Sequence, residues 1–402
     1  MRLVDALAAA IPAPAAKRGV LVLRLFGIGD ALLFRAAVER YAEAIGVPLD
    51  ELAILGSTAW APVAPLFYRG LRVELIDERR MARDPLYRLA TLVRIRRRGY
   101  RIALCGMRYR QPHVVDSLMV ASGAVERIAI EPRANPKYDG MFAHYRPKLT
   151  RIVPSPDAPP GFAQGAVPMR RRHELEHQAT FLSALAGRPI ELALPTLAPP
   201  PGPTPLLEPG ERALLLNLGA SHGPRRWPLA FHLELARRAL AAGVSAIFLG
   251  GPTERPLAYE VATAIAGLDA STGRARAIAA IDTLDFADVA RLVAAAAATV
   301  SSDTGIGHLA ILMGRPAALI VGGGHFGPFM PYPPALEPKG ARFVHVPMAC
   351  YHCDWSCSVM APGAATFPCI ERVAPERIWA ALLELGLLDA PADGASTAAR
   401  AP

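Results

Sequence analysis

The sequence Val20-Leu-Val-Leu-Arg-Leu25 runs directly into Phe26-Gly27-Ile28-Gly29-Asp30, and apolar residues at helical spacing follow over 31–45. A short apolar run that ends at glycines and precedes a helical pattern predicts a strand, a tight turn and a helix. Strand-like and helix-like segments alternate in this way along much of the chain. This alternation predicts an α/β protein with parallel, doubly wound sheets.

A proline-rich segment divides the alternating pattern into two halves. Residues 197–211 carry too many prolines for a helix or a central strand. We therefore expect one Rossmann-like domain over 1–200 and a second over 201–388, facing each other across a cleft, with a disordered tail rich in alanine and proline at 389–402.

The composition is that of a folded globular protein. The chain has 402 residues, of which 52% are hydrophobic and 20% charged, and its mean hydropathy is +0.24; these values exclude a disordered or fibrous protein. Charged residues, proline or glycine interrupt each apolar run before it reaches membrane-spanning length. Asp5 and the basic pair after it do not fit a secretory signal, and we expect a cytoplasmic protein.

Charge is distributed unevenly along the chain. Residues 1–200 hold 29 Lys and Arg against 18 Asp and Glu, and residues 201–402 hold 15 against 17. An excess of positive charge in one half of a chain attracts an anionic partner such as a nucleic acid, a phosphorylated glycolipid or an anionic membrane surface. The alternative is a solvated arginine-rich face.

The glycine turn after the first predicted strand is a candidate catalytic site. Ligands bind at the carboxyl ends of strands in open α/β sheets, and Gly27 and Gly29 would let a substrate approach the backbone there. The Asp30 carboxylate could accept a proton from a hydroxyl nucleophile. The alternative is that Asp30 only caps the following helix.

A second candidate site is the segment from Ser301 to His308, which lies between a strand end and a helix. Small polar residues and free N–H groups at a helix N-terminus bind phosphate or diphosphate, and His308 could hydrogen-bond the same anion. A well-capped helix with a packed histidine is the alternative. The segment 217–228 also follows a predicted strand, and Arg225 or Arg226 could bind a phosphate as a bidentate fork.

Two further patterns resemble metal sites. His173-Glu-Leu-Glu-His177 matches the short HExxH pattern, but no third ligand is evident, and a helix at the surface or domain edge is the better interpretation. Four cysteines are spaced C-x2-C-x3-C-x11-C, which indicates a zinc site, reactive thiols or a compact loop with small side chains: Cys350, Cys353, Cys357 and Cys369.

Five segments together resemble glycosyltransferase family 9, the ADP-heptose:lipopolysaccharide heptosyltransferase family. In chain order they are 24–33, 217–228, 248–254, 303–310 and the cysteine-rich stretch before the last helix. The resemblance covers about residues 20–388. It implies a GT-B fold, with the acceptor bound by the first domain and the nucleotide sugar by the second.

The resemblance also implies roles for single residues. Asp30 looks like the general base of an inverting displacement, with Gly27 and Gly29 on the acceptor side. The donor and its phosphates would be bound by Asp303, Thr304, Gly305, His308, Arg225, Glu254 and Ser221. No divalent cation is required for this chemistry, because a helix N-terminus, His308 and Arg225 could stabilise the leaving diphosphate.

The implied partners are a nucleotide-sugar donor, an anionic glycolipid or glycan acceptor, and peripheral contact with the inner face of the cytoplasmic membrane. Arg225 stands where this family usually has lysine, and Gly322–Pro328 differs from the usual donor-side loop. Two alternatives are a sugar-nucleotide epimerase or hydrolase of the same fold and a non-catalytic binding protein. Nucleic acid is not expected, because the basic segments contain few interleaved aromatic residues.

Overall fold

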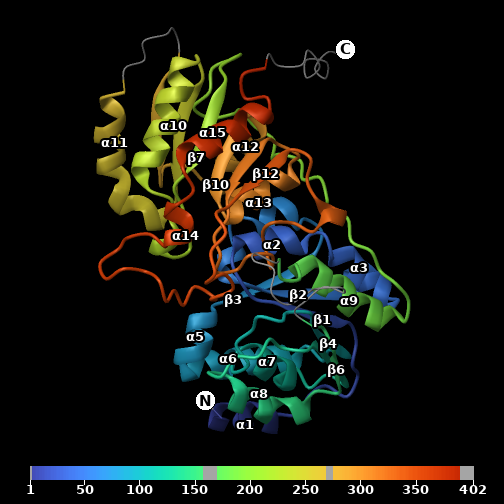
Figure 1. Cartoon of the computed structure of the whole chain (residues 1–402). Coiled ribbons are helices and arrows are strands. Elements are labelled where there is room, and N and C mark those ends of the chain that lie inside the picture. Colours follow the sequence, from blue (N-terminus) through green and yellow to red (C-terminus); the bar gives the residue numbers. More distant parts are fainter. Residues whose placement is uncertain (1, 157–169, 269–274, 390–402) are drawn as a thin grey trace, which may run out of the picture.

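The computed structural model describes residues 2–156, 170–268 and 275–389, so the expected tail over 389–402 falls almost entirely outside the described residues. Two six-stranded sheets form the frame of the molecule (Figure 1). All pairings between their neighbouring strands are parallel. The predicted α/β class with doubly wound parallel sheets is confirmed.

The first sheet has the order β3-β2-β1-β4-β5-β6. Its strands are β1 (Val20–Arg24), β2 (Leu52–Ser57), β3 (Arg72–Ile76), β4 (Ile102–Cys105), β5 (Glu126–Ile130) and β6 (Arg151–Val153). The helices of this half are α1 (Arg2–Ala10), α2 (Ile28–Phe34), α3 (Val38–Ile45), α4 (Ala64–Phe67), α5 (Glu78–Arg83), α6 (Pro85–Arg97), α7 (Val115–Ala121), α8 (Asp139–Tyr145) and α9 (Glu174–Ala186).

The second sheet repeats the topology, with the order β12-β11-β10-β7-β8-β9. Its strands are β7 (Ala213–Asn217), β8 (Ser245–Gly250), β9 (Ala277–Ile281), β10 (Ala298–Ser302), β11 (Ala317–Ile320) and β12 (Ala341–Val344). Its helices are α10 (Leu229–Ala241), α11 (Ala258–Ala266), α12 (Phe286–Ala295), α13 (Gly305–Leu312), α14 (Pro368–Glu371) and α15 (Pro375–Glu384). In each sheet the first strand in the chain is an inner strand, with the next two strands on one side of it and the last three on the other. Doubly wound folds bind ligands at the point where the strand order switches sides.

Strand β1 is apolar throughout because both faces of its sheet are covered. Val20 and Val22 belong to a core that continues into the second half of the molecule. Leu21 and Leu23 point to the other face, into a separate core under α6 and α7. A central parallel strand that is buried on both sides does not alternate apolar and polar residues, which explains the uninterrupted apolar run.

The helix expected over residues 31–45 is two helices. The N–H groups of residues 35–37 bond to carbonyls three residues back, which tightens the chain between α2 and α3. The two helices also have different partners, because α2 packs on α13 of the second half whereas α3 packs on α9. The local pattern could not predict this division, since it depends on distant partners.

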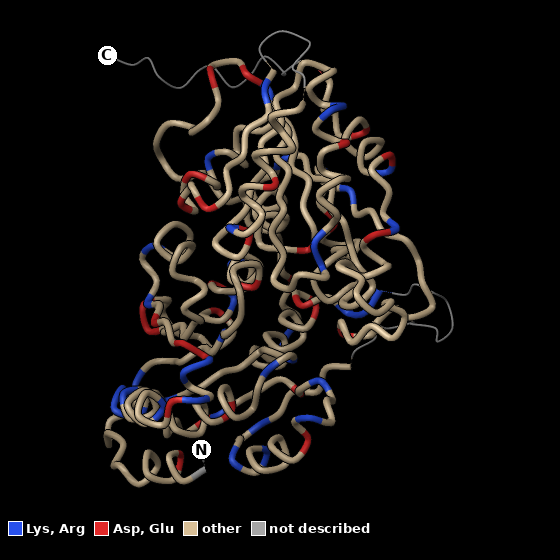
Figure 2. The backbone as a smooth tube through the Cα atoms, turned by 90° about the vertical axis from the view of Figure 1, so that its left-hand side faces the viewer, with Lys and Arg blue, Asp and Glu red and all other residues tan. Residues whose placement is uncertain are grey.

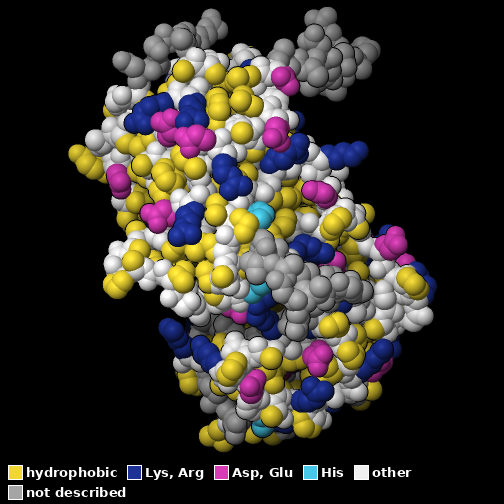
Figure 3. All heavy atoms as spheres, in the orientation of Figure 1, with side chains coloured by type: hydrophobic (Ala, Val, Ile, Leu, Met, Phe, Trp, Pro, Cys, Tyr) yellow, Lys and Arg dark blue, Asp and Glu magenta, His cyan; other side chains and the backbone are white. Residues whose placement is uncertain are grey.

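The uneven charge of the sequence is also visible in space. Figure 2 shows Lys and Arg gathered around the half of the molecule that contains the N-terminus. On the face drawn in Figure 3 the surface is hollowed between the two halves, and basic side chains lie along the lower rim of the hollow. Within the part of the chain that the structure describes, no helix is both long and apolar enough to cross a membrane.

Candidate active site between the two sheets

Asp30 lies in the first turn of α2, directly beyond the carboxyl end of β1. Gly27, not Asp30, is the N-cap of α2, and no side chain caps this helix end. The interpretation of Asp30 as a simple helix cap is therefore wrong. Its side chain is 17% exposed. Burial is the main reason that the pKa of Asp30 is raised to about 7, although the Arg24 charge acts in the opposite direction.

The N-terminus of α13 faces this turn from the second half. Thr304 is the N-cap of α13, and its side chain does not cap the helix. Instead, the Thr304 hydroxyl oxygen lies 3.2 Å from the Asn217 amide nitrogen, which donates to it, and 3.0 Å from the Ser301 hydroxyl. No side chain therefore caps this end of α13, and uncapped N–H groups at a helix N-terminus are typical of phosphate sites.

Two glycines let the halves meet at this point. A Cβ on Gly29 would lie 3.1 Å from Cδ2 of His308, and a Cβ on Gly305 would lie 2.9 Å from Cγ2 of Ile28. Side chains at these positions would push α2 and α13 apart. The glycines therefore bring the carboxylate of Asp30 and the N-terminus of α13 to opposite sides of one site.

Asp303 and His308 form a buried pair beside the α13 N-terminus. Their nearest side-chain atoms, Oδ1 and Nε2, are 3.6 Å apart, and His308 Nδ1 lies 2.8 Å from the Tyr332 hydroxyl. Burial alone would raise the pKa of Asp303, but the interaction with His308 and the charge of Arg225 outweigh it and lower that pKa. Asp303 is thus held as a carboxylate.

Arg225 is fixed in the same site by three contacts. Its guanidinium donates to the Ser221 hydroxyl at 2.7 Å and to the Asp303 carbonyl at 2.8 Å. Its carbon Cζ lies 4.4 Å from the ring centroid of Trp355, a favourable cation–π arrangement. The structure therefore groups five of the predicted donor residues: Ser221, Arg225, Asp303, Thr304 and His308.

Glu254 lies nearby but is already engaged. It is 2% exposed, and its carboxylate accepts hydrogen bonds from Arg226, the Thr253 hydroxyl and the Gly251 N–H. A Cβ on Gly219, at the end of β7, would lie 3.4 Å from it. Glu254 thus borders the same edge of the second sheet. The two arginines of the pair have different partners, since Arg225 reaches Asp303 and Arg226 reaches Glu254.

The loop around residues 350–357 contributes residues that the motifs did not predict. Trp355 covers Arg225, and Asp354 forms ion pairs with Arg133 and Arg171 from the first half. His352, Asp354 and Trp355 all have positive φ values. Strain of this kind is often found at functional sites.

Three consecutive glycines make room for that loop. A Cβ on Gly323 would come within 2.1 Å of the Tyr351 ring, and one on Gly324 within 2.4 Å of the Trp355 indole. The run Gly322-Gly323-Gly324 is therefore a packing requirement of the aromatic side chains beside it.

We predict that Gly323→Ala destabilises the protein by about 1–3 kcal/mol, as overpacking of a well-filled site does. It should also weaken nucleotide binding, because it displaces Tyr351 and with it the loop that carries Trp355. Thermal unfolding with and without nucleotide measures both effects. Gly140→Ala is the matched control, because nothing lies within 4 Å of its new Cβ. A Gly323→Ala variant as stable as the control would contradict the packing argument.

A zinc site, one of the three interpretations of the cysteine spacing, is not supported by the arrangement of the cysteines. All four are free thiols; Cys369 is buried on α14, whereas Cys350, Cys353 and Cys357 are partly exposed along the loop. Within residues 2–156, 170–268 and 275–389, no three His, Cys, Asp or Glu side chains gather as a metal-binding group. Tetrahedral zinc needs its ligands to meet around one point. The compact-loop interpretation fits the cysteines better.

Of the two positions expected for the helix at the HExxH pattern, the surface and the domain edge, the structure has the helix at the domain edge. His173 caps α9 and is fully buried, and His177 is 2% exposed. The two rings have separate partners, since His173 Nε2 lies 2.8 Å from the Phe329 carbonyl and His177 Nδ1 lies 2.7 Å from the Ser155 hydroxyl. Helix α9 instead packs within the molecule, against α3 and against a loop of the second half.

A cavity of about 800 Å³ opens next to Gly27, at the carboxyl ends of the first sheet. Its lining is mixed, with Phe26 and Met107 beside charged side chains that include Asp77, Glu78, Arg79, Arg83 and Arg110. Arg110 is already paired with Asp116, which leaves Arg79 and Arg83 as cations that could face a ligand. The cavity is large enough for a small oligosaccharide.

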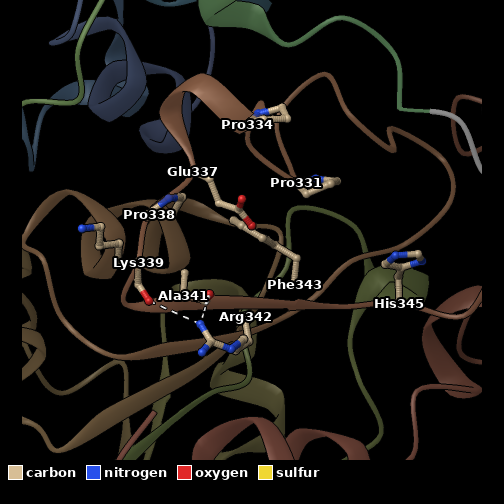
Figure 4. Close-up of a pocket in the computed structure, with 9 residues that line it drawn as sticks. All are labelled: Pro331, Pro334, Glu337, Pro338, Lys339, Ala341, Arg342, Phe343 and His345. Atoms are coloured by element: carbon tan, nitrogen blue, oxygen red, sulfur yellow. Dashed lines mark hydrogen bonds between the residues drawn. The ribbon is translucent and has the colours of Figure 1, made fainter. Parts of the chain in front are cut away.

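A second pocket, of about 630 Å³, lies away from these residues (Figure 4). It borders β12, the edge strand of the second sheet, and Arg342 at its floor donates to the carbonyls of Lys339 and Ala341. None of the predicted site residues lines it. The candidate active site is therefore the region between the two sheets.

Comparison with solved structures identifies the fold as GT-B. The chain resembles E. coli ADP-heptose lipopolysaccharide heptosyltransferase II, with a TM-score of 0.60, 16% identity, and coverage of 92% of this chain and 98% of that one. A family 9 glycosyltransferase from Veillonella parvula has a TM-score of 0.62, 15% identity and coverage of 94% and 100%. E. coli heptosyltransferase WaaC with ADP has a TM-score of 0.60, 15% identity and coverage of 91% and 99%.

The two parallel six-stranded sheets and the helices around them define a protein of the GT-B class. Residues 200–332 match the model of glycosyltransferase family 9 (heptosyltransferase). This match confirms the resemblance over that part of the chain and, together with the fold, indicates a glycosyltransferase. Comparison with curated protein sequences gives no match.

Proposed function

We propose that the protein is an inverting transferase that moves heptose or a related sugar from a nucleotide sugar, with ADP as the nucleotide, to a lipopolysaccharide-core or other cell-envelope glycan. The observation that carries this proposal is the approach of Asp30 to the N-terminus of α13 across Gly29 and Gly305. A base on one side and an anion site on the other is the arrangement that an in-line displacement needs. WaaC, a similar structure, is described with ADP.

Asp30 serves as the base in this mechanism. Its raised pKa, about 7, makes the carboxylate basic enough to take a proton from an acceptor hydroxyl as that oxygen attacks the anomeric carbon. The bond from the anomeric carbon to the diphosphate oxygen breaks on the opposite face, and inversion follows. Gly27 and Gly29 keep this face open for the acceptor.

The leaving diphosphate is stabilised by groups of the second domain. The N–H groups of Gly305 and its neighbours, the positive end of α13 and the Arg225 guanidinium all face the position where negative charge develops. Ser221 and Asp303 hold Arg225, and Thr304 shapes the turn. These groups supply the charge stabilisation of the proposed step without a divalent cation.

The acceptor is proposed to occupy the 800 Å³ cavity beside Gly27. Arg79 and Arg83 in its lining and the basic first half favour an anionic glycolipid or glycan. We further propose peripheral contact with the inner face of the cytoplasmic membrane, where such an acceptor is held. Of the basic clusters, Arg170–Arg172 bind residues of the chain itself, so they are weaker candidates for this contact than exposed Arg97.

Thermal unfolding with ADP, GDP, UDP, CMP and NAD tests the donor class. A ligand at about 100 times its dissociation constant stabilises the folded state by about 2.7 kcal/mol, which raises the midpoint by several degrees. We expect the largest shift with ADP. A shift with UDP or GDP alone would exclude an ADP-linked donor, and no shift with any nucleotide would favour the non-catalytic alternative.

A second measurement separates transfer from the epimerase or hydrolase alternative. Incubation with ADP-heptose alone is expected to leave the donor intact, because the reaction needs an acceptor hydroxyl. NMR of the anomeric proton measures loss of the donor. Rapid loss of the donor without an acceptor would contradict the proposed function.

A further inference from the structure

A buried charged array lies behind Asp30. Arg24, the last residue of β1, is 2% exposed, and its Nη1 donates to Glu174 at 2.5 Å while its Nη2 lies 3.4 Å from Asp30 Oδ1. Glu174, the first residue of α9, is 3% exposed. One guanidinium therefore faces two carboxylates, of which Glu174 is almost fully buried and Asp30 is partly exposed.

Hydrogen bonds fix Glu174 within this array. Its Oε1 accepts from Gln178 Nε2 at 2.8 Å, and the same nitrogen donates to the carbonyl of Gly106 at 2.7 Å. The Tyr41 hydroxyl donates to Gln178 Oε1 at 2.6 Å. Residues of α3, α9 and the end of β4 thus hold Glu174 where it competes with Asp30 for Arg24. In Figure 1, α9 lies beside α3.

We propose that Arg24 and Glu174 are positioning residues for the reaction: Arg24 orients the Asp30 carboxylate, and Glu174 draws part of the Arg24 charge away so that Asp30 keeps its basicity. This inference rests on the proposed role of Asp30 as the base. Without Glu174, Arg24 would bind Asp30 as a full ion pair and make it a weak base. Without Arg24, Asp30 would be buried without a cation and remain protonated.

The charged groups that face Asp30 come from every element around it. Burial has the largest effect on its pKa and raises it; Arg24 on β1 lowers it, and Glu174, Asp303 and Glu78 raise it. His308 on α13 approaches from the second half and is paired with Asp303. Arg24 and Glu174 are the pair whose removal changes the charge next to Asp30 and leaves the donor site untouched.

Carboxyl titration by ¹³C NMR of aspartate-labelled full-length protein tests the inference without substrate. The Asp30 signal is assigned by its loss in Asp30→Asn. We expect Glu174→Gln to lower the Asp30 midpoint by about one pH unit. The double variant Arg24→Met with Glu174→Gln removes both buried charges and is expected to raise the midpoint above the wild-type value.

The double variant keeps the test decisive if Glu174→Gln does not fold, because it leaves no unpaired buried charge from this pair. Glu176→Gln is the matched control, since Glu176 lies on the same helix but pairs with Arg170, and it should not move the Asp30 midpoint. An unchanged or raised midpoint in Glu174→Gln, or a double variant at or below the wild-type midpoint, would overturn the inference.

Activity of Asp30→Asn separates the two proposals. If Asp30→Asn is inactive but the Asp30 titration midpoint is unchanged in Glu174→Gln and in the double variant, only the role of Arg24 and Glu174 is overturned. A fully active Asp30→Asn enzyme would overturn the base assignment and, with it, the positioning role.

Discussion

Replacement of Asp30 with asparagine is expected to lower turnover by about 10³-fold and to leave ADP affinity nearly unchanged. The amide fills the same space but cannot take a proton, and general-base catalysis contributes about 10²–10⁴-fold. The proposed donor contacts come from the second half of the molecule, on the far side of Gly29 and Gly305. Steady-state transfer assays and calorimetric ADP titration measure the two quantities.

The pH dependence of the wild-type enzyme provides an independent check. Only the deprotonated form of Asp30 acts as a base, and its pKa is raised to about 7. We expect kcat/KM to rise with pH below about 7 and to level off above it. A profile that is already flat from pH 5 upward, or an Asp30→Asn variant with wild-type turnover, would exclude Asp30 from this role.

Replacement of Arg225 with methionine is expected to lower turnover by about 10²–10³-fold and to weaken ADP binding, because one preorganised group that stabilises developing charge is lost. Arg225→Lys should restore part of the activity, since lysine keeps the charge but neither the fork nor the stacking on Trp355. Transfer kinetics and ADP titration of both variants measure the effect.

Arg255→Met is the control for this experiment. Arg255 belongs to the same domain, but its side chain is 72% exposed and it pairs with Asp282. Its loss should change neither turnover nor ADP affinity by more than about twofold, because exposed ion pairs contribute little. Equal effects of the two arginine substitutions would show that the loss at Arg225 is not specific to the donor site.

Local sequence pattern was sufficient to predict the strands and turns that position the candidate site residues. Strand β1, its glycine turn and Asp30 lie within eleven consecutive residues, and the α13 N-terminus follows β10 in the same way. Both patterns place functional groups at the carboxyl ends of parallel strands, where ligands bind. This local geometry carried the prediction of Asp30, Thr304 and His308.

The groups that the sequence did not reveal depend on contacts between distant segments. Trp355 reaches Arg225 from 130 residues away through a loop with positive φ values, and nothing in the local pattern predicts it. The sequence could have predicted that Arg24 has a buried acidic partner, because an arginine at the end of an otherwise apolar buried strand requires one. Its partner Glu174, however, lies 150 residues away in sequence.

The proline-rich boundary could be predicted from local sequence, whereas the burial of helix α9 depends on distant contacts. Residues 197–211 form no helix or strand, as their prolines predict. The burial of His173 and His177 could not be predicted from the HExxH pattern, because it comes from packing against α3 and the Phe329 loop.

The ion pairs of Asp354 make the association of the two halves sensitive to ionic strength. Asp354 is 41% exposed, and its partners Arg133 and Arg171 belong to the opposite half. Attraction between charges this accessible to solvent weakens as the Debye length shortens, from about 10 Å at 0.1 M salt to about 3 Å at 1 M. Salt would therefore weaken this contact between the halves by a small amount, because exposed ion pairs contribute little. It would leave the close approach of Gly29 to α13 unchanged, because that contact involves no ion pair.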